Sequence, residues 1–431
     1  MKSNISLIIV LLCLLFPTSI YAQDMEEEVE YETRGVGEHA FIIDAQVRAR
    51  GEYRNGAVVP RGEADKAAMF VNERTRLGIG YASDGIQLQF SGQHAGVWGI
   101  QGINGSSDGF SINTAWGQIN TNNRLFSARV GRQTLSYDNE RIIGANDWSA
   151  PGNSHNALRL AYEDEWHKLH ILGAINRSEE RVNGNFYNDT ITNLYKNMQT
   201  LWYHFGNISY PIQGSLLLMN IGRETGVEGA PKTNYLQTMG VFVTYDTYHL
   251  GATVEGYYQM GKEVNDDKTS AWMAAVDFRY TLNNEWTFNL GYDYLSGSEA
   301  TDKKNHSFCP LYGSFHSFHG AMDYFTSSYF QPFHEGLSDI HAGCKWNAYK
   351  DVSVSGSYHF LSTSSDMVQL SHEADFTANW QIKKDVTLNL GYSFAINSKN
   401  MNRLLGGSNK KWQSFCFLQL NISPRVLFHT W

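Results

Sequence analysis

The chain has 431 residues, of which 13% are aromatic, 39 are glycine and only 8 are proline, and its formal net charge is -9 at pH 7. This acidic balance offers no basic face for nucleic acid, and four cysteines are too few for a disulfide framework. Mean hydropathy is -0.38, and beyond the first residues no segment has the roughly 18 apolar residues that a membrane helix needs.

The first 22 residues are typical of an export signal. Lys2 gives a positive start, residues 5–16 are apolar but too few to span a bilayer, and Ala22 suits cleavage. An acidic run follows within residues 23–38. We interpret it as a solvated tail, with a partner-binding arm as the alternative.

The rest of the chain, residues 39–431, reads as one domain built from a repeated pattern. About ten residues alternate in polarity, and then a turn follows. In residues 39–54 the arginines Arg48 and Arg50 share one parity, while Val47 and Ala49 share the other. Successive side chains of a strand point to opposite faces, so one face meets water and the other meets hydrocarbon.

The same alternation predicts further strands in chain order. They lie near residues 70–81, 86–93, 111–120, 124–132, 156–164, 167–176, 197–209, 213–223, 234–246, 248–261, 269–281, 285–296, 336–347, 350–362, 371–382, 385–398 and 411–422. The pattern supports a count between 17 and 19, and bacterial barrels have even numbers, so we expect about 18. Pro424 should break or bulge the final ladder, because proline cannot donate a backbone hydrogen bond.

The predicted fold class is therefore all-β: a transmembrane antiparallel β-barrel with a polar lumen and long extracellular loops. Aromatic residues near strand ends suit the two interfacial girdles of such a barrel. Those singled out are Trp202, Tyr210, Trp272, Trp286, Trp346, Trp380 and Trp412.

Arginine on the water-facing parity is the most specific chemical signal. A charge that faces lipid at mid-depth costs roughly 2–4 kcal/mol, so these side chains should line the lumen, where they attract anions. The candidate pore-lining residues are Arg48, Arg50, Arg74, Arg76, Arg129, Arg132, Arg141 and Arg159. The alternative is that they pair with acids and brace the wall, the nearby acids being Asp44, Glu52, Glu140 and Glu163.

Three motifs resemble the alginate export family. They are Arg48-Ala-Arg50-Gly-Glu52 with Asn72 to Gly78, then Val130 to Gly144 with Asp147-Trp148, and Leu311 to Phe325. The resemblance implies an 18-stranded barrel that passes anionic polysaccharide by passive diffusion through an arginine-lined, loop-gated pore. It also implies that Asp138 and Glu140 pair with the lumen arginines or tune selectivity.

The segment 297–335 is too long for an ordinary connection, so we expect it to gate or narrow the barrel mouth. Its candidate gating residues are His316, His319, Asp323 and Tyr324. Its aromatic residues either stack on sugars or pack the folded loop. With His306, Cys309 and His334 of the same segment, His316 and His319 could bind a transition metal, but the His316-x-x-His319 spacing on a loop is a weak signal. We therefore expect no metal and no cofactor.

No catalytic motif is present: the chain lacks G-x-S-x-G, a phosphate-binding loop and H-E-x-x-H. We therefore expect a channel and not an enzyme, in the outer membrane of a Gram-negative bacterium. The expected partners are outer-membrane lipid, an anionic polysaccharide or oligosaccharide, and a periplasmic secretion or uptake protein, with no nucleic acid. The alternatives are a general or nutrient-specific porin and, less favoured, a barrel enzyme or an adhesin.

Overall fold

The computed structural model describes residues 39–100, 109–177, 179–187, 195–325, 332–408 and 412–431. The predicted export signal and acidic tail lie outside the described residues. In the described part of the chain, no helix has the length and apolar character needed to cross a bilayer.

Nineteen strands are described, and each predicted strand segment has its counterpart among them. They are β1 (His39–Asn55), β2 (Ala68–Ser83), β3 (Ile86–Val97), β4 (Phe110–Asn120), β5 (Phe126–Gln133), β6 (His155–Glu163), β7 (His167–Ile175), β8 (Asn197–Phe205), β9 (Ile212–Glu224), β10 (Thr233–Asp246), β11 (Leu250–Lys262), β12 (Lys268–Thr281), β13 (Trp286–Leu295), β14 (Leu337–Tyr349), β15 (Val352–Ser362), β16 (Gln369–Lys383), β17 (Val386–Asn397), β18 (Gln413–Ile422) and β19 (Arg425–Thr430).

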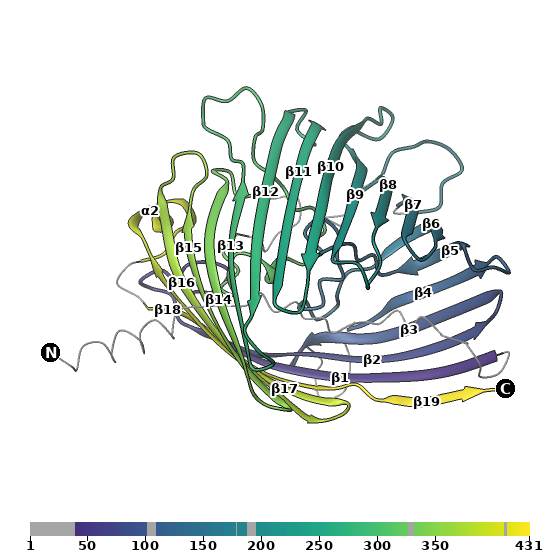
Figure 1. The fold of residues 1–431 in the computed structure, drawn as a ribbon. Coiled ribbons are helices and arrows are strands. Elements are labelled where there is room, and N and C mark those ends of the chain that lie inside the picture. The colour runs from purple at the N-terminus through teal and green to yellow at the C-terminus, as the bar shows by residue number, and fades with distance from the viewer. Residues whose placement is uncertain (1–38, 101–108, 178, 188–194, 326–331, 409–411) are drawn as a thin grey trace.

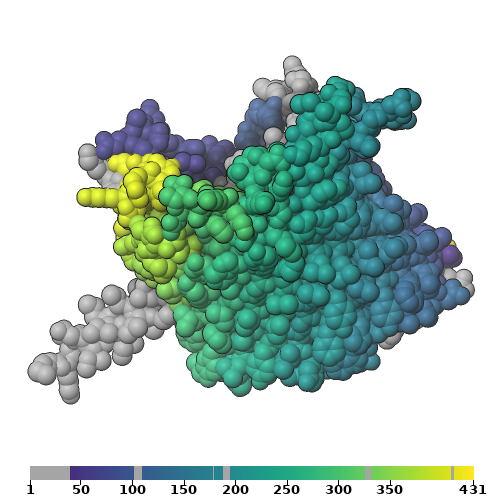
Figure 2. Space-filling view, turned by 90° about the horizontal axis from the view of Figure 1, so that it is seen from above, coloured from purple at the N-terminus to yellow at the C-terminus, as the bar shows by residue number. Residues whose placement is uncertain are grey.

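From β1 to β18, each strand pairs antiparallel with the next strand in the chain, and the sheet closes on itself. Strand β1 pairs with β2 on one side and with both β18 and β19 on the other. Because β18 and β19 follow each other along β1, the nineteen segments fill eighteen positions around a closed barrel. Figure 1 shows β19 running alongside β1, and in Figure 2 the purple start and the yellow end of the barrel lie next to each other.

The pairing of β1 with β18 and β19, here called the seam, is interrupted at Pro424. The register of β1 shifts between Ile43 and Asp44. The Ala45 amide instead donates to the Pro424 carbonyl oxygen at 3.1 Å. The expected break in the final ladder is confirmed, and it follows from the missing N–H of proline.

The two faces of the barrel carry the polarity that the sequence predicts. In β17, Leu390, Tyr392 and Ile396 are exposed on the outer face, whereas Ser393 and Ala395 are buried on the inner face. Trp202 corrects the girdle prediction. It is 8% exposed and points inward, where its indole N–H donates to Asp138.

Short turns connect the strands at one rim and longer connections at the other, as in bacterial outer-membrane barrels. Two of the longer connections fold into the lumen. They are residues 134–154, here called the inner loop, and residues 296–325 with 332–336, here called the long loop. Buried apolar residues from both loops belong to the core, among them Leu135, Ile143, Leu311 and Met322. The long loop contains the short 3-10 helix η1 (Phe315–Ser317), and the helix α2 (Lys399–Leu405) lies between β17 and β18.

Candidate functional site in the barrel lumen

Four arginines from β1 and β2 form the first part of the site. Arg48 and Arg74 lie directly opposite each other in the register, and Arg50 follows two residues along the same face. Arg48, Arg50 and Arg74 are all at least 95% buried. Arg76 donates to Gln93 and to Asn113 of the neighbouring strands. The alternation of the strand therefore gathers like charges on one patch of the inner wall.

The inner loop brings a carboxylate to this patch. Asp147 accepts from the Arg48 Nη1 at 2.8 Å and from the Arg74 Nη1 at 2.6 Å. Burial alone would raise the pKa of the Asp147 carboxyl, but the charges of Arg74 and Arg48 more than offset it, so that pKa lies below its usual range. Asp147 therefore stays ionised and ties the loop to the wall.

Trp148 is the next contact between the inner loop and its surroundings. The Arg50 guanidinium carbon lies 3.5 Å from the centroid of the Trp148 ring, and Arg50 also donates to the Trp148 carbonyl oxygen. On another side, the Trp148 ring stacks on His316 of the long loop, with ring centroids 3.6 Å apart. His316 in turn lies 2.9 Å from Asp323. The cation–π contact between Arg50 and Trp148 contributes about 0.5–2 kcal/mol.

The two loops form one body inside the barrel. Ile143 and Tyr312 make an isolated parallel bridge, and the Gly144 amide donates to the Tyr312 carbonyl oxygen at 3.0 Å. Ser314 of the long loop binds the Glu140 carboxylate and accepts from the Asn146 amide. The inner loop and the long loop therefore narrow the lumen together.

A second arginine pair lies on β5 and β6. Arg129 and Arg159 are directly opposite each other in the register, and both are buried. Arg129 donates to Gln118 at 2.7 Å, and its guanidinium carbon lies 3.8 Å from the centroid of the Trp116 ring.

Arg132 lies on the other parity of β5. It is opposite Asn156, which is exposed, and its Nε donates to the Ile112 carbonyl oxygen. The geometry thus separates it from the lumen-facing pair Arg129 and Arg159.

Arg141 is enclosed by carboxylates of the opposite wall. Its Nη1 donates to Asp293 at 2.7 Å, and its Nη2 and Nε donate to Glu255 at 2.8 and 3.0 Å. The side chain is 3% exposed, and its guanidinium lies over the Phe318 ring. Arg141 therefore anchors the inner loop to β11 and β13.

The five predicted acids lie in different surroundings. Glu163 pairs with His170 at 2.7 Å. Asp44 pairs with Arg425 at 3.0 Å near the short-turn rim, and Glu52 accepts from Arg50 and Arg54. The partners of Asp44 and Glu52 are thus arginines, as the bracing alternative expects.

Asp138 and Glu140, in contrast, bind neutral donors. Asp138 accepts from Trp202 at 3.0 Å and from Ser215 at 2.6 Å, and burial raises the pKa of its carboxyl despite these hydrogen bonds. Glu140 binds Ser314 of the long loop. The described hydrogen bonds of these two acids thus hold the loops in place and do not include the lumen arginines.

The candidate gating residues are packed between loop and wall. His319 is 4% exposed beside Asp293, and Tyr324 is 5% exposed, with its hydroxyl 3.4 Å from Asn397. Phe315 is also buried, which favours loop packing over sugar stacking for that ring. Tyr329 and Phe330 lie outside the described residues.

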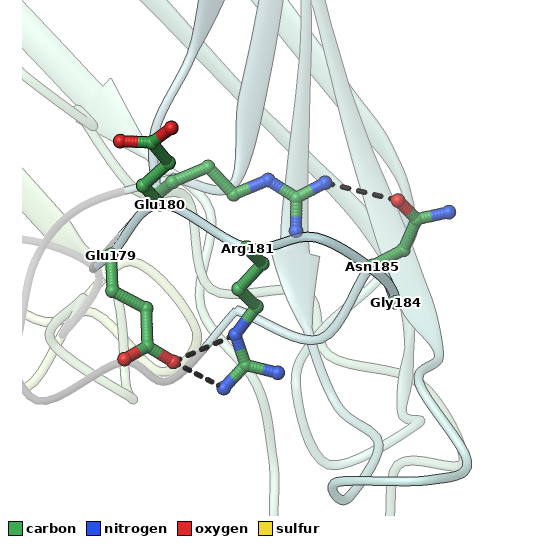
Figure 3. A pocket seen from close by; sticks show the side chains of 6 residues that line it. Glu179, Glu180, Arg181, Gly184 and Asn185 are labelled. Atoms are coloured by element: carbon green, nitrogen blue, oxygen red, sulfur yellow. Dashed lines mark hydrogen bonds and ion pairs between the residues drawn. The ribbon is translucent and has the colours of Figure 1, made fainter.

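A cavity of about 130 Å³ lies between the long loop and β12–β16. Its lining includes Arg141, His319, His341, His359 and Asp375. A hollow of about 650 Å³ lies over the β7–β8 connection, and Figure 3 shows its lining of Arg177, Glu179, Glu180, Arg181, Gly184 and Asn185. Its arginines bind Glu179 and Asn185 of the same segment, so this hollow brings no predicted site residue together.

Several residues of this site were not singled out from the sequence. The alternation places Glu255 and Asp293 on the inner parity of β11 and β13, yet nothing local indicates that Arg141 is their partner. The motif Asp147-Trp148 was recognised as a sequence pattern, but its contacts with Arg48 and Arg50 depend on how the inner loop folds.

A family model described as alginate export matches residues 43–371. The comparison with curated proteins yields no match. Three solved barrels share the fold. OpdK from Pseudomonas aeruginosa, solved with vanillate, has 9% identity and a TM-score of 0.59, and the match covers 90% of this chain and 99% of that one.

The second barrel, OccK9 (OpdG) of P. aeruginosa, has 10% identity and a TM-score of 0.61, with 89% and 98% of the two chains covered. The third, OccK2 (OpdF) of P. aeruginosa in complex with glucuronate, has 10% identity and a TM-score of 0.59, with 90% and 98% covered.

Proposed function

We propose that this chain, which belongs to the alginate export family, passes anionic polysaccharide or oligosaccharide of the alginate type through an arginine-lined lumen by passive diffusion. The family and the fold establish that the protein is a porin-like β-barrel channel of the Gram-negative outer membrane. The substrate class and the role of the arginines are the proposed part.

The observation that carries the proposal is the direct cross-strand pairing of like charges. Arg48 faces Arg74, and Arg129 faces Arg159, all on buried inner positions. Like charges directly opposite each other destabilise a sheet. A passing carboxylate would be attracted to such a pair, as the carboxylate of Asp147 is to Arg48 and Arg74, and arginine binds carboxylates with two parallel hydrogen bonds.

The positions of the two loops support a lumen that selects an extended chain and does not pass all solutes alike. The inner loop and the long loop fill part of the lumen and hold Asp147 and Trp148 against the arginine patch. A polymer of carboxylated sugars would exchange its carboxylates between successive arginines, and binding at many weak sites permits movement.

A second candidate is a porin for small carboxylated nutrients. Two barrels of the same fold were solved with glucuronate and with vanillate, both of which are carboxylates. In either case the protein would act without catalysis, with outer-membrane lipid around it and a periplasmic secretion or uptake protein as a further partner.

The proposal is tested by reversal potential in a planar bilayer under a salt gradient, with and without uronic-acid oligomers. The wild type should prefer anions, and the oligomers should block the current. The double variant Arg129→Gln with Arg159→Gln should lower the anion-to-cation permeability ratio by about two-fold or more, because two lumen charges are lost. Arg132→Gln, on the same strand but the other face, is the matched control and should change nothing.

A cation-preferring or non-conducting wild type would overturn the anion channel. Blockade by glucuronate monomer at the same concentration of uronate units as the oligomers would favour the nutrient porin. An equal effect of Arg132→Gln would overturn the assignment of Arg129 and Arg159 to the lumen.

A further inference from the structure

Three imidazoles and one carboxylate meet where the long loop touches the wall. Asp339 and His341 come from β14, His359 lies directly opposite His341 on β15, and His319 comes from the long loop. All four are at least 91% buried. In Figure 1, β14 and β15 run side by side.

One oxygen of Asp339 is the centre of this group. Its Oδ2 lies 2.8 Å from His359 Nδ1, 3.5 Å from His319 Nδ1 and 3.8 Å from His341 Nδ1. Ligand atoms of Asp339, His341 and His359 all lie within 4.8 Å of one another. In a tetrahedral zinc site with bonds of about 2.0–2.1 Å, neighbouring ligand atoms are about 3.3 Å apart. These distances bracket that value.

Several polar atoms in the group lack a hydrogen-bond partner although they are buried. They are Asp339 Oδ1, His341 Nδ1 and His319 Nδ1, and the nearby Asp293 Oδ1 and Asp375 Oδ1 share this property. A buried polar atom without a partner costs about 1–3 kcal/mol. Three of these atoms, on Asp339, His341 and His319, lie together around the Asp339 carboxylate, where a bound species would complete the group.

Outer carboxylates orient two of the imidazoles. Asp277 of β12 lies 2.8 Å from His341 Nε2, and Asp375 of β16 lies 3.7 Å from His359 Nε2. A carboxylate on the far nitrogen of a histidine fixes the ring and leaves the other nitrogen for a metal. The neighbouring acids also favour a cation over an anion at this point.

We propose that Asp339, His341 and His359, with His319 as the fourth ligand, bind a divalent transition-metal cation of the Zn²⁺ type. Imidazole with carboxylate suits zinc and its neighbours, whereas Mg²⁺ and Ca²⁺ require oxygen ligands. The site shares only His319 with the weak loop pattern in the sequence, since His316 binds Asp323 and His306 binds the Ser270 carbonyl oxygen.

The consequence for the channel follows from where the ligands come from. Three belong to the wall strands β14 and β15, and His319 belongs to the long loop. The cation therefore fixes the long loop against β14 and β15. The cavity of about 130 Å³ beside His319 and His359 gives it access.

The test is zinc titration by calorimetry on the chelator-treated full chain in detergent micelles. The wild type should bind one Zn²⁺ per chain. His341→Gln and His359→Gln should each weaken binding by about 100-fold or more, and His319→Ala by about ten-fold, because they remove ligands. His372→Gln is the matched control. It lies on β16 but bonds to Tyr358 on the outer face, so its affinity should be unchanged.

Two further readouts keep the proposal testable where a variant fails to fold. Co²⁺ added to the wild type should give the intense visible absorption of a four-coordinate site. Zn²⁺ should reduce current fluctuations of the wild type in a bilayer, and this effect should disappear in His319→Ala.

Absence of saturable Zn²⁺ binding and of the Co²⁺ absorption would overturn the proposal in favour of a protonated histidine–carboxylate network or a bound water. Binding that survives both His341→Gln and His359→Gln, or equal affinity for Ca²⁺, would overturn it as well. Unchanged zinc affinity in His319→Ala would overturn the role of the long loop.

Discussion

The two halves of the inner wall carry opposite charge. Strands β1–β6 present arginines: Arg48, Arg50, Arg74, Arg76, Arg129 and Arg159. Strands β11–β16 present mainly acids: Glu255, Asp277, Asp293, Asp339, Glu373 and Asp375. The inner loop gives each half the charge that it lacks, because Arg141 binds the acidic half and Asp147 binds the basic half.

The difference separates an arginine that braces the wall from the arginines to which the proposed function assigns the substrate. Arg141 binds two buried carboxylates. Arg48 and Arg74, in contrast, share the single carboxylate of Asp147. The bracing alternative thus describes Arg141, while the basic half keeps an arrangement that suits an anionic ligand.

The substitution Arg141→Met should have the largest effect on the contrast between the two halves of the wall. The substitution leaves Glu255 and Asp293 buried without their cation, so we expect a loss of about 3–5 kcal/mol in the free energy of unfolding. The measurement is the temperature at which the folded gel band converts to the unfolded one. Freeing the inner loop should also raise single-channel conductance.

Arg279→Met is the control for Arg141→Met. Arg279 pairs with Asp246 near the short-turn rim, where both side chains are over one-third exposed. Exposed pairs contribute about 0–1 kcal/mol. Equal losses in the two variants would contradict the anchoring role of Arg141.

A smaller effect is expected from Asp147→Asn, which removes the carboxylate shared by Arg48 and Arg74. The stability loss should be about 2 kcal/mol, since hydrogen bonds to charged groups contribute about 1.5–3 kcal/mol. Anion preference should rise, because two lumen arginines lose their counter-charge. Reversal potential and thermal gel shift measure the two effects.

The same carboxyl predicts a pH dependence. Because the folded-state pKa of Asp147 is lowered, its stabilising contribution is present above the unfolded pKa and is lost as pH falls through the folded pKa. The wild type should thus approach the Asp147→Asn behaviour in acid, and the variant should show less change there. An identical acid response of both proteins would contradict this.

The smallest effect should come from Glu73→Gln, which changes a charge on the outer face. Glu73 pairs with His94 at 2.9 Å and accepts from Trp98 on partly exposed positions. We expect less than about 1 kcal/mol in stability and no change in reversal potential. A shift in selectivity as large as that of Asp147→Asn would show that the lumen does not control permeation.

The fold was predictable because alternation in strands is local information. Val47 and Arg48 are neighbours in the chain and point to opposite faces whatever the rest of the sequence does. The same logic fails where a partner is distant. Arg141 and Asp293 are 152 residues apart. The sequence pattern indicates that Asp293 faces inward on a strand and that Arg141 lies in a loop, but it does not indicate that they pair.

Trp202 shows another limit of local reasoning. Its place near a strand end indicated an interfacial girdle, yet it lies on the inner parity of β8 with Met198 and Thr200, and Asp138 of the inner loop accepts from its indole. The group of Asp339, His341 and His359 on β14 and β15, proposed above as a metal site, could not be predicted for a similar reason. His341 and His359 are separated in sequence and meet only through the cross-strand register.

The seam also determines when the barrel can close during folding. Strand β1 has β2 as one partner close by in the chain, but its second partner comes from residues 414–430, far along the chain. Until that second pairing forms, both edges of the sheet are open to pairing with other chains. The interruption at Pro424 divides the closing ladder into nine register pairs with β18 and five with β19. Removing residues 425–431 should therefore leave a barrel in which β1 stays paired with β18 near the long-loop rim but has no partner on that side near the short-turn rim.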